Sequence, residues 1–211
     1  MLITFEGIEG SGKTTQIKHV ARFLNEKGHN CIITREPGGT EIGKKIRSIL
    51  LNPKSKGIDP LSEFFLYAAD RAQHLKEVVN PCLSLKKTVL CDRFFDATVV
   101  YQGFARGLDL ELIHRVHRLI LQDLRPNITI LLDLPPEIGL SRAWGQIKNG
   151  TRVGFETRFE NEKLVFHETV RSGYLKLASL EPQRFKVVSA VPDENQVRDD
   201  VIKVVNRYLG R

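Results

Sequence analysis

A run of small residues that ends in a lysine and a threonine lies near the start of the chain. The run consists of Gly7, Ile8, Glu9, Gly10, Ser11, Gly12, Lys13 and Thr14. Its glycines let successive backbone N–H groups point inward toward anionic oxygen, and the positive end of a following helix adds to the attraction. Lys13 can reach the β- and γ-phosphates of ATP, and the Thr14 hydroxyl can bind Mg²⁺. The spacing therefore predicts a phosphate-binding loop.

The segments on either side supply the elements that such a loop needs. Apolar residues 2–5 predict a strand before it, and residues 16–25 have helical periodicity after it. Short apolar runs predict four more strands, at 30–34, 88–92, 128–134 and 185–189. Further helical patterns cover 41–51, 61–79, 110–124, 159–180 and 197–209. Because short apolar strands that alternate with helices are typical of a parallel sheet covered on both faces, we expect one domain over residues 1–211. Its expected class is α/β, a three-layer α/β/α fold of the P-loop NTPase type with five parallel strands and a short lid insert.

Charged residues follow two of the predicted strands, at the edge where parallel α/β sheets bind their ligands. Arg35 and Glu36 come after the second strand, and Asp92 and Arg93 close the third. Asp92 could hold Mg²⁺ through water, and Arg93 could bind a phosphate with two parallel hydrogen bonds. A surface ion pair is the alternative, but a charged pair at the end of a buried strand needs a partner. We therefore predict ligand contacts here.

Two further groups could recognise a planar ligand. Tyr67 and Arg71 are four residues apart on a predicted helix and share a face. They could stack on a base and donate to its edge, although spacing alone favours a core aromatic beside a solvated arginine. Thr98, Tyr101 and Gln102 form a polar edge in an otherwise apolar stretch.

A basic, glycine-containing segment is predicted to form an irregular loop at 144–155, with Arg142, Lys148, Arg152 and Arg158 in or beside it. A solvated basic loop is the default interpretation. Phosphoryl transfer, however, needs cations on the transferred group, and the phosphate loop itself contains no arginine. We therefore expect a lid over about residues 142–156, with Arg142 as the first candidate for the catalytic cation and Arg152 as the second.

Five motifs, taken in order, resemble those of the bacterial thymidylate kinase family: residues 7–14, 34–40, 67–71, 92–94 and 101–103. The resemblance extends over nearly the whole chain. It implies a P-loop kinase, usually a homodimer, that converts dTMP and MgATP to dTDP and ADP in dTTP biosynthesis.

The resemblance also implies roles for individual residues. Lys13 and Thr14 would bind the ATP phosphates and Mg²⁺, while Glu9 would lie near the sugar and phosphate of dTMP. Arg47 and Arg93 would hold the dTMP phosphate. Tyr67 would stack on thymine, Arg71 would donate to thymine O4, and Thr98 and Gln102 would contact the rest of the base edge. Tyr101 would exclude a 2′-hydroxyl, and Glu36 would contact the sugar. Ala97 stands where many relatives have serine, a departure that bears on base recognition.

Composition limits the alternatives. The net charge of +7, from 32 basic and 25 acidic residues, is compatible with nucleic-acid binding. The chain has no basic tail and no basic strand interleaved with aromatics, so we expect small phosphorylated ligands and no nucleic acid as partner. Apolar runs fall far short of the roughly 18 residues of a membrane helix, and the first residues do not resemble a signal peptide. With three cysteines expected to be reduced, a cytoplasmic protein without membrane contact is predicted.

Competing enzyme classes differ in the motifs they require. A GTPase would add Asp-x-x-Gly and Asn-Lys-x-Asp, and neither string occurs in the chain. A deoxynucleoside kinase stays open as an alternative, but it would need a base to accept a hydroxyl proton and would have less use for Arg47 and Arg93. A non-catalytic nucleic-acid-binding protein with a P-loop is the third alternative.

Overall fold

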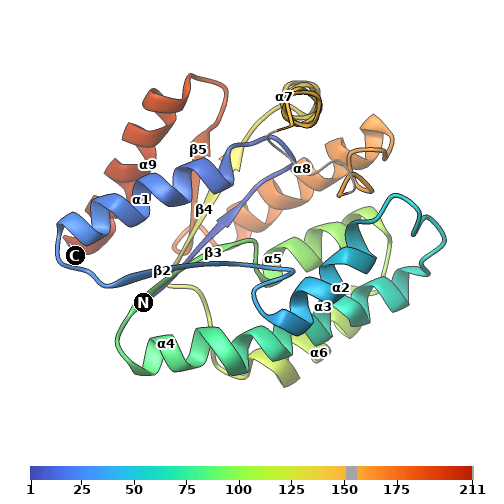
Figure 1. The fold of residues 1–211 in the computed structure, drawn as a ribbon, viewed down its shortest axis with the longest axis horizontal. Coiled ribbons are helices and arrows are strands. Elements are labelled where there is room, and N and C mark those ends of the chain that lie inside the picture. Colours follow the sequence, from blue (N-terminus) through green and yellow to red (C-terminus); the bar gives the residue numbers. More distant parts are fainter. Residues whose placement is uncertain (151–155, 211) are drawn as a thin grey trace.

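The computed structural model describes residues 1–150 and 156–210, and within them it forms one parallel sheet with helices on both faces (Figure 1). The strands are β1 (Leu2–Glu6), β2 (Cys31–Arg35), β3 (Thr88–Asp92), β4 (Ile128–Asp133) and β5 (Phe185–Ser189). The α-helices are α1 (Lys13–Glu26), α2 (Glu41–Leu51), α3 (Pro60–His74), α4 (Asn80–Ser84), α5 (Phe95–Thr98), α6 (Leu110–Leu121), α7 (Pro136–Lys148), α8 (Leu164–Leu180) and α9 (Glu194–Leu209). Two π-helical segments, η1 (Leu75–Val79) and η2 (Val99–Ala105), continue α3 and α5.

The sheet has the order β2-β3-β1-β4-β5, and all its strand pairs are parallel. This confirms the expected sheet class. β1 lies at the centre, where every one of its residues is buried. Phe5 pairs with Asp92 on one side and with Ile130 on the other. The phosphate loop that follows β1 is therefore flanked by the ends of β3 and β4.

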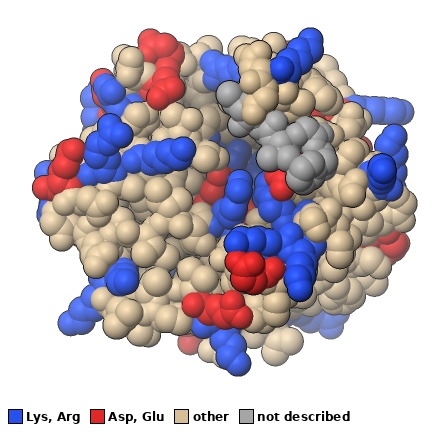
Figure 2. All heavy atoms as spheres, viewed as in Figure 1, with Lys and Arg blue, Asp and Glu red and all other residues tan. Residues whose placement is uncertain are grey.

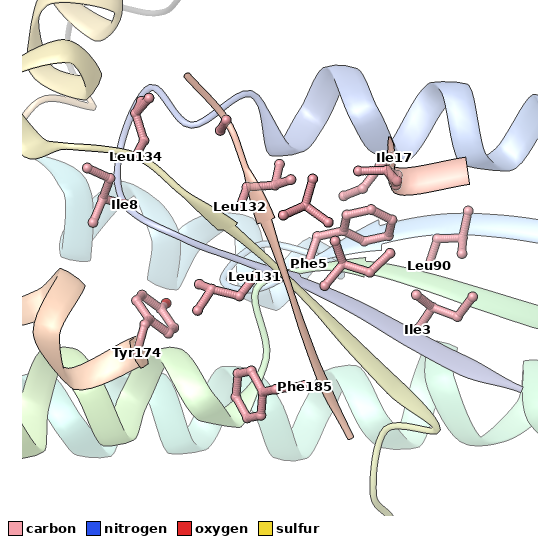
Figure 3. Close-up of a cluster of buried hydrophobic side chains, with 14 of the residues drawn as sticks. Ile3, Phe5, Ile8, Ile17, Leu90, Leu131, Leu132, Leu134, Tyr174 and Phe185 are labelled. Atoms are coloured by element: carbon pink, nitrogen blue, oxygen red, sulfur yellow. The ribbon is translucent and has the colours of Figure 1, made fainter. Parts of the chain in front are cut away.

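Helices complete the three layers. α1 and α9 pack against each other on one face of the sheet, whereas α8 packs on β4, β5 and η2 (Figure 1). The apolar core between the layers includes Phe5 and Ile17, which are buried together (Figure 3). Tyr174 of α8 lies on the opposite side of β1, because its hydroxyl reaches Glu6 and successive strand side chains point to opposite faces.

The structure corrects two of the predicted boundaries. Residues 144–148, predicted as loop, form the last turns of α7. Pro136 begins this helix, because proline at the first helical position loses no hydrogen bond and has a helical φ. The helix predicted from residue 159 starts at Leu164. None of the helices in the described ranges combines the length and hydropathy needed to cross a membrane.

Candidate active site

The phosphate loop joins β1 to α1, and its shape depends on glycine. Gly7, Gly10 and Gly12 have φ values of 139°, 71° and 86°, in the region that residues with a Cβ atom rarely adopt. A Cβ atom on Gly10 would also collide with the carbonyl oxygen of Gly139 in α7. Figure 3 shows Ile8 of the loop near Leu134 at the end of β4. The loop is thus held between the sheet edge and α7.

Lys13 folds back over the loop. Its Nζ donates to the backbone oxygens of Gly7 (2.9 Å) and Ile8 (2.8 Å) and to Oγ of Ser11 (3.2 Å). Burial and the nearby Arg93 charge lower the pKa of Lys13 to about 8. A bound anion would oppose both effects, since an opposite charge favours the protonated ammonium.

Thr14 and Asp92 form a pair of oxygen donors beside the loop. Oγ1 of Thr14 donates to Oδ2 of Asp92 at 2.8 Å, although the two residues are 78 positions apart. Mg²⁺ is commonly bound by one or two protein oxygens together with substrate phosphates and water. The donor chemistry and the place of this pair fit the expected Mg²⁺ site.

Arg93 follows the last residue of β3 and contacts Glu9 of the loop. Its NH2 donates to Oε1 of Glu9 (2.9 Å), its NH1 donates to the Tyr174 hydroxyl (3.1 Å), and its guanidinium lies 5.0 Å from the Tyr101 ring centroid. Lys and Arg side chains gather around the hollow in the middle of the face shown in Figure 2. The predicted phosphate ligands are therefore close to one another.

Glu9 receives hydrogen bonds from two of these groups. Its Oε1 accepts from Arg93 and also from the Tyr101 hydroxyl at 2.7 Å. Burial alone would raise the pKa of Glu9, but the Arg93 charge, assisted by His167, Lys13 and Tyr101, holds that pKa well below its usual range. Glu9 is therefore an ionised carboxylate in a buried position.

Arg71 is buried and fixed in place by three groups, so the solvated-arginine interpretation is wrong. It is 1% exposed, and it contacts Oε2 of Glu36 (2.7 Å), Nε2 of His117 (3.1 Å) and Oγ1 of Thr98 (3.1 Å). Burial and the Arg71 charge lower the pKa of His117 to about 2, so its ring is neutral and its Nε2 accepts. His74 also donates to Glu36, at 2.8 Å.

Arg47 reaches the cleft from α2. Its Nε and NH2 donate to the two carboxylate oxygens of Glu156 (2.9 and 2.6 Å), and its NH1 donates to the Pro37 carbonyl (3.1 Å). Thr40 begins α2 by accepting the Gly43 N–H at 2.9 Å, which satisfies an N–H group that the helix itself leaves unpaired. The carboxylate of Glu156 therefore pairs with Arg47, one of the two arginines predicted to bind the acceptor phosphate.

These groups surround one cleft of about 470 Å³, a size suited to a small ligand. Most of the predicted site residues line it: Glu9, Gly10, Gly12, Lys13, Thr14, Glu36, Arg47, Tyr67, Arg71, Asp92, Arg93, Thr98, Tyr101 and Gln102, together with Ala97. Gly7, Ile8 and Ser11 belong to the loop behind this lining.

Of the two candidates for the catalytic cation, the structure describes only Arg142, and it does not bring this residue to the cleft. Arg142 donates to the backbone oxygens of Ala190 (2.8 Å) and Val191 (3.0 Å), in the loop after β5. It does not belong to the cleft lining among the described residues. Arg152 lies outside the described residues. The lid and its cation therefore stay predictions.

Several site residues were missed by sequence reasoning. Glu63 of α3 accepts from Gln102 at 2.8 Å and pairs with Arg158, which had been predicted only as one of the basic residues in or beside the irregular loop. Tyr174, His167 and Glu156 contact predicted site residues from positions 81 to 158 residues away in the chain. No local pattern could identify them, since a lone His or Tyr on a helix is more commonly core.

Comparisons with known proteins agree with this geometry. The family model described as thymidylate kinase matches residues 5–201. A thymidylate kinase of Desulfosudis oleivorans is 53% identical over 207 residues, which cover 98% of this chain and 97% of that protein. One from Desulforapulum autotrophicum is 55% identical over 210 residues, covering 100% and 92%. The crystal structure of thymidylate kinase from Ehrlichia chaffeensis superposes with a TM-score of 0.77 at 35% identity, and the match covers 97% of this chain and 98% of that one.

Proposed function

Because the chain belongs to the thymidylate kinase family, we propose that it transfers the γ-phosphoryl group of ATP to dTMP, giving dTDP and ADP. One observation carries this proposal beyond the family match. Arg93 and Arg47 line the same cleft as Lys13, so three cationic side chains share one cleft. A second phosphate is the acceptor that such an arrangement suits, because arginine binds phosphate with two parallel hydrogen bonds.

On the donor side, the loop amides and Lys13 would hold the ATP phosphates. Thr14 and Asp92 would hold Mg²⁺, which when bound neutralises phosphate charge. The Lys13 ammonium would exchange its hydrogen bonds with Gly7 and Ile8 for phosphate oxygens. This exchange removes no charge from the site, and it aims the ammonium at the transferred group.

On the acceptor side, Arg93 and Arg47 would bind the dTMP phosphate, with Glu9 near the sugar. Arg71 would donate to thymine O4. Glu36, Thr98 and His117 hold its guanidinium, and a guanidinium with five N–H donors has others left for a ligand. The remaining proposed contacts are those of Tyr67, Tyr101, Gln102 and Thr98, with Glu36 at the sugar.

The chemistry requires little proton transfer. An acceptor phosphate oxygen is already ionised at pH 7, so no strong general base is needed. Catalysis would come from in-line positioning and from cations that neutralise the transferred group. Glu9, which is ionised and paired with Arg93, would orient the acceptor and would not remove a proton from it.

We also propose that the protein acts as a homodimer in the cytoplasm. Phe65 on α3 is 50% exposed and Leu119 on α6 is 79% exposed, and these two helices pack together. Exposed apolar side chains on adjacent helices support self-association. Sedimentation of the wild type against Leu119→Asp tests the dimer, and an unchanged monomeric mass for both would contradict it.

A panel of acceptors tests the reaction. ADP release with MgATP is measured for dTMP, dUMP, dCMP, dGMP, UMP and thymidine. We expect dTMP to give the highest kcat/KM. Preference for another monophosphate would overturn the base-recognition roles of Tyr67 and Arg71. Preference for thymidine would favour a deoxynucleoside kinase, and the absence of turnover together with salt-sensitive DNA binding would favour a nucleic-acid-binding protein.

A further inference from the structure

One oxygen of Glu9 faces a buried histidine that the proposed mechanism does not use. His167, on α8, is 1% exposed, and its Nδ1 lies 3.3 Å from Oε2 of Glu9. Within the described residues, neither Oε2 of Glu9 nor either ring nitrogen of His167 has a hydrogen-bond partner. Buried polar atoms without partners are rare and costly. Their concentration at a site residue calls for a functional explanation.

The other oxygen of the same carboxylate already has its partners. Oε1 accepts from Arg93 at 2.9 Å and from Tyr101 at 2.7 Å, so a third group on Oε2 would fix the carboxylate plane. A separation of 3.3 Å is long for a charge-assisted hydrogen bond, which usually measures about 2.7–2.9 Å. Catalytic hydrogen bonds are often long in ligand-free enzymes and shorten when substrate binds.

Helix α8 contacts the Arg93–Glu9 pair at both ends. His167 approaches Glu9, and Tyr174 accepts from Arg93 while its hydroxyl donates to Glu6 at 2.7 Å. The two residues are seven positions apart, which is about two helical turns, so they lie on the same face of α8. A residue needed only to fill the core at position 167 would not have to be polar.

We propose that His167 is a positioning residue for the acceptor site. Its Nδ1–H donates to Oε2 of Glu9, which keeps Oε1 on Arg93 and Tyr101 and so fixes the direction in which Arg93 presents its guanidinium. This inference rests on the proposed function, because it assumes that Arg93 and Glu9 act on the dTMP side of the cleft. It predicts an effect on the acceptor and none on ATP binding.

Three substitutions separate this role from core packing. The amide nitrogen of His167→Asn falls near the position of Nδ1, that of His167→Gln falls near Nε2, and His167→Leu keeps the volume without a donor. We expect Leu and Gln to lower kcat/KM for dTMP about 10- to 100-fold, as for the loss of a hydrogen bond to a charged group. We expect Asn to stay within about 3-fold of the wild type. The KM for ATP should not change in any of the three.

The matched control is Val170→Ala, which removes a buried apolar group from the same helix. It should lower the denaturation midpoint without changing the ratio of the two KM values. Circular dichroism verifies that each variant folds. If the His167→Leu variant does not fold, the comparison of His167→Asn with His167→Gln tests the proposal, and equal activities of these two variants would overturn it.

A double-mutant cycle tests whether His167 acts through Glu9. In a Glu9→Gln background, His167→Leu should have little further effect on kcat/KM for dTMP. Additive losses would overturn the proposal, as would wild-type activity of His167→Leu in the native background. A wild-type protein that does not turn over dTMP would instead refute the proposed function, so the two failures are distinguishable.

Discussion

Arg93 combines an unusual backbone conformation with a central place in the site. Its φ is 65°, a value that is uncommon for residues with a Cβ atom and that persists where surrounding contacts enforce it. Those contacts are present: the next N–H, that of Phe94, donates to Oε1 of Glu6 at 2.7 Å, and Sγ of Cys91 contacts the Arg93 carbonyl oxygen at 3.0 Å. The turn aims the guanidinium at Glu9 and into the cleft. Strain at this residue is therefore consistent with a site built before its ligand arrives.

At the same scale, Lys13→Ala should nearly abolish turnover and leave the fold intact. Losing one cation from the transferred phosphoryl group should cost on the order of 10³-fold in kcat or more. Burial lowers the pKa of Lys13 to about 8, so the charged lysine does not stabilise the ligand-free fold, and its loss should not lower the melting temperature by more than a few degrees. Coupled ADP release and thermal denaturation measure the two effects. An unchanged kcat would remove Lys13 from the mechanism.

Single residues also show where sequence reasoning ended. The phosphate loop, Asp92 and Arg93 could be predicted because each is a local pattern at the end of a strand. The partners that fix them could not, since Glu9 and His167 are 158 positions apart in the chain. The burial of Arg71 was likewise beyond local spacing, because it depends on Glu36, Thr98 and His117 from three other segments.

Among the elements, α7 supports the phosphate loop by close contact of two backbones. A Cβ atom at Gly139 would lie 2.5 Å from the Glu9 carbonyl oxygen and 2.9 Å from Cδ1 of Ile8. Gly139→Ala should therefore displace the loop, lower stability by about 1–3 kcal/mol and raise the KM for ATP.

A matched control lies on the same helix. A Cβ atom at Gly145 would meet no atom within 4 Å, so Gly145→Ala should stabilise the protein by up to about 1 kcal/mol without changing the KM for ATP. Urea unfolding and initial rates measure both variants. If Gly139→Ala behaved like Gly145→Ala, the contact would have no part in shaping the loop.

The elements differ in how well their sequences predicted them. All five strands were predicted to within a residue or so, because each is a short apolar run between turn residues. α7 was predicted in part as loop, since its glycines and basic residues are typical of irregular structure. Gly139, earlier in the same helix, has a packing reason that only the structure reveals, namely its contact with the loop, whereas Gly145 has no such contact. The segment η2, which carries Tyr101 and Gln102, is π-helical, a form that often occurs at functional sites and that has no simple sequence pattern.

At the scale of the whole molecule, the parallel sheet explains why distant motifs meet. β1, between β3 and β4, delivers the phosphate loop to the same edge as Asp92 and Arg93. Helices α2, α3 and α8 then bring Arg47, Arg71 and His167 to that edge. The sequence predicted that the sheet is parallel but not the order of its strands, because the pairing of parallel strands is not encoded in any local segment. The shared edge of the sheet was enough to predict that the phosphate loop meets Asp92 and Arg93, whereas the roles of Arg47, Tyr67 and Arg71 were implied only by the family resemblance.

The buried charge of this central region should make folding stability depend on pH through Glu6. Burial, with a further contribution from the Asp96 charge, raises the pKa of Glu6 to about 8, against the opposing effects of Arg93, Tyr174 and the Phe94 N–H. Between about pH 4.5 and about pH 8 the folded protein therefore keeps a proton that the unfolded chain has lost. The contribution of this proton to stability is fully present below that window and is lost as the pH rises through it.

Glu6→Gln should remove this dependence, because the amide resembles the protonated carboxyl and can still accept from Phe94 and contact Tyr174. We expect the free energy of unfolding of the variant to exceed that of the wild type increasingly from pH 5 to pH 8, by on the order of a few kcal/mol at pH 8. Urea titrations without nucleotide at pH 5, 6, 7 and 8 give the difference in the free energy of unfolding between the two proteins. The pKa of Asp70 is also raised, to about 6, but its contribution cancels from this difference because both proteins contain Asp70. A difference that stays constant with pH would mean that Glu6 is ionised in the fold and that the Arg93 charge outweighs its burial.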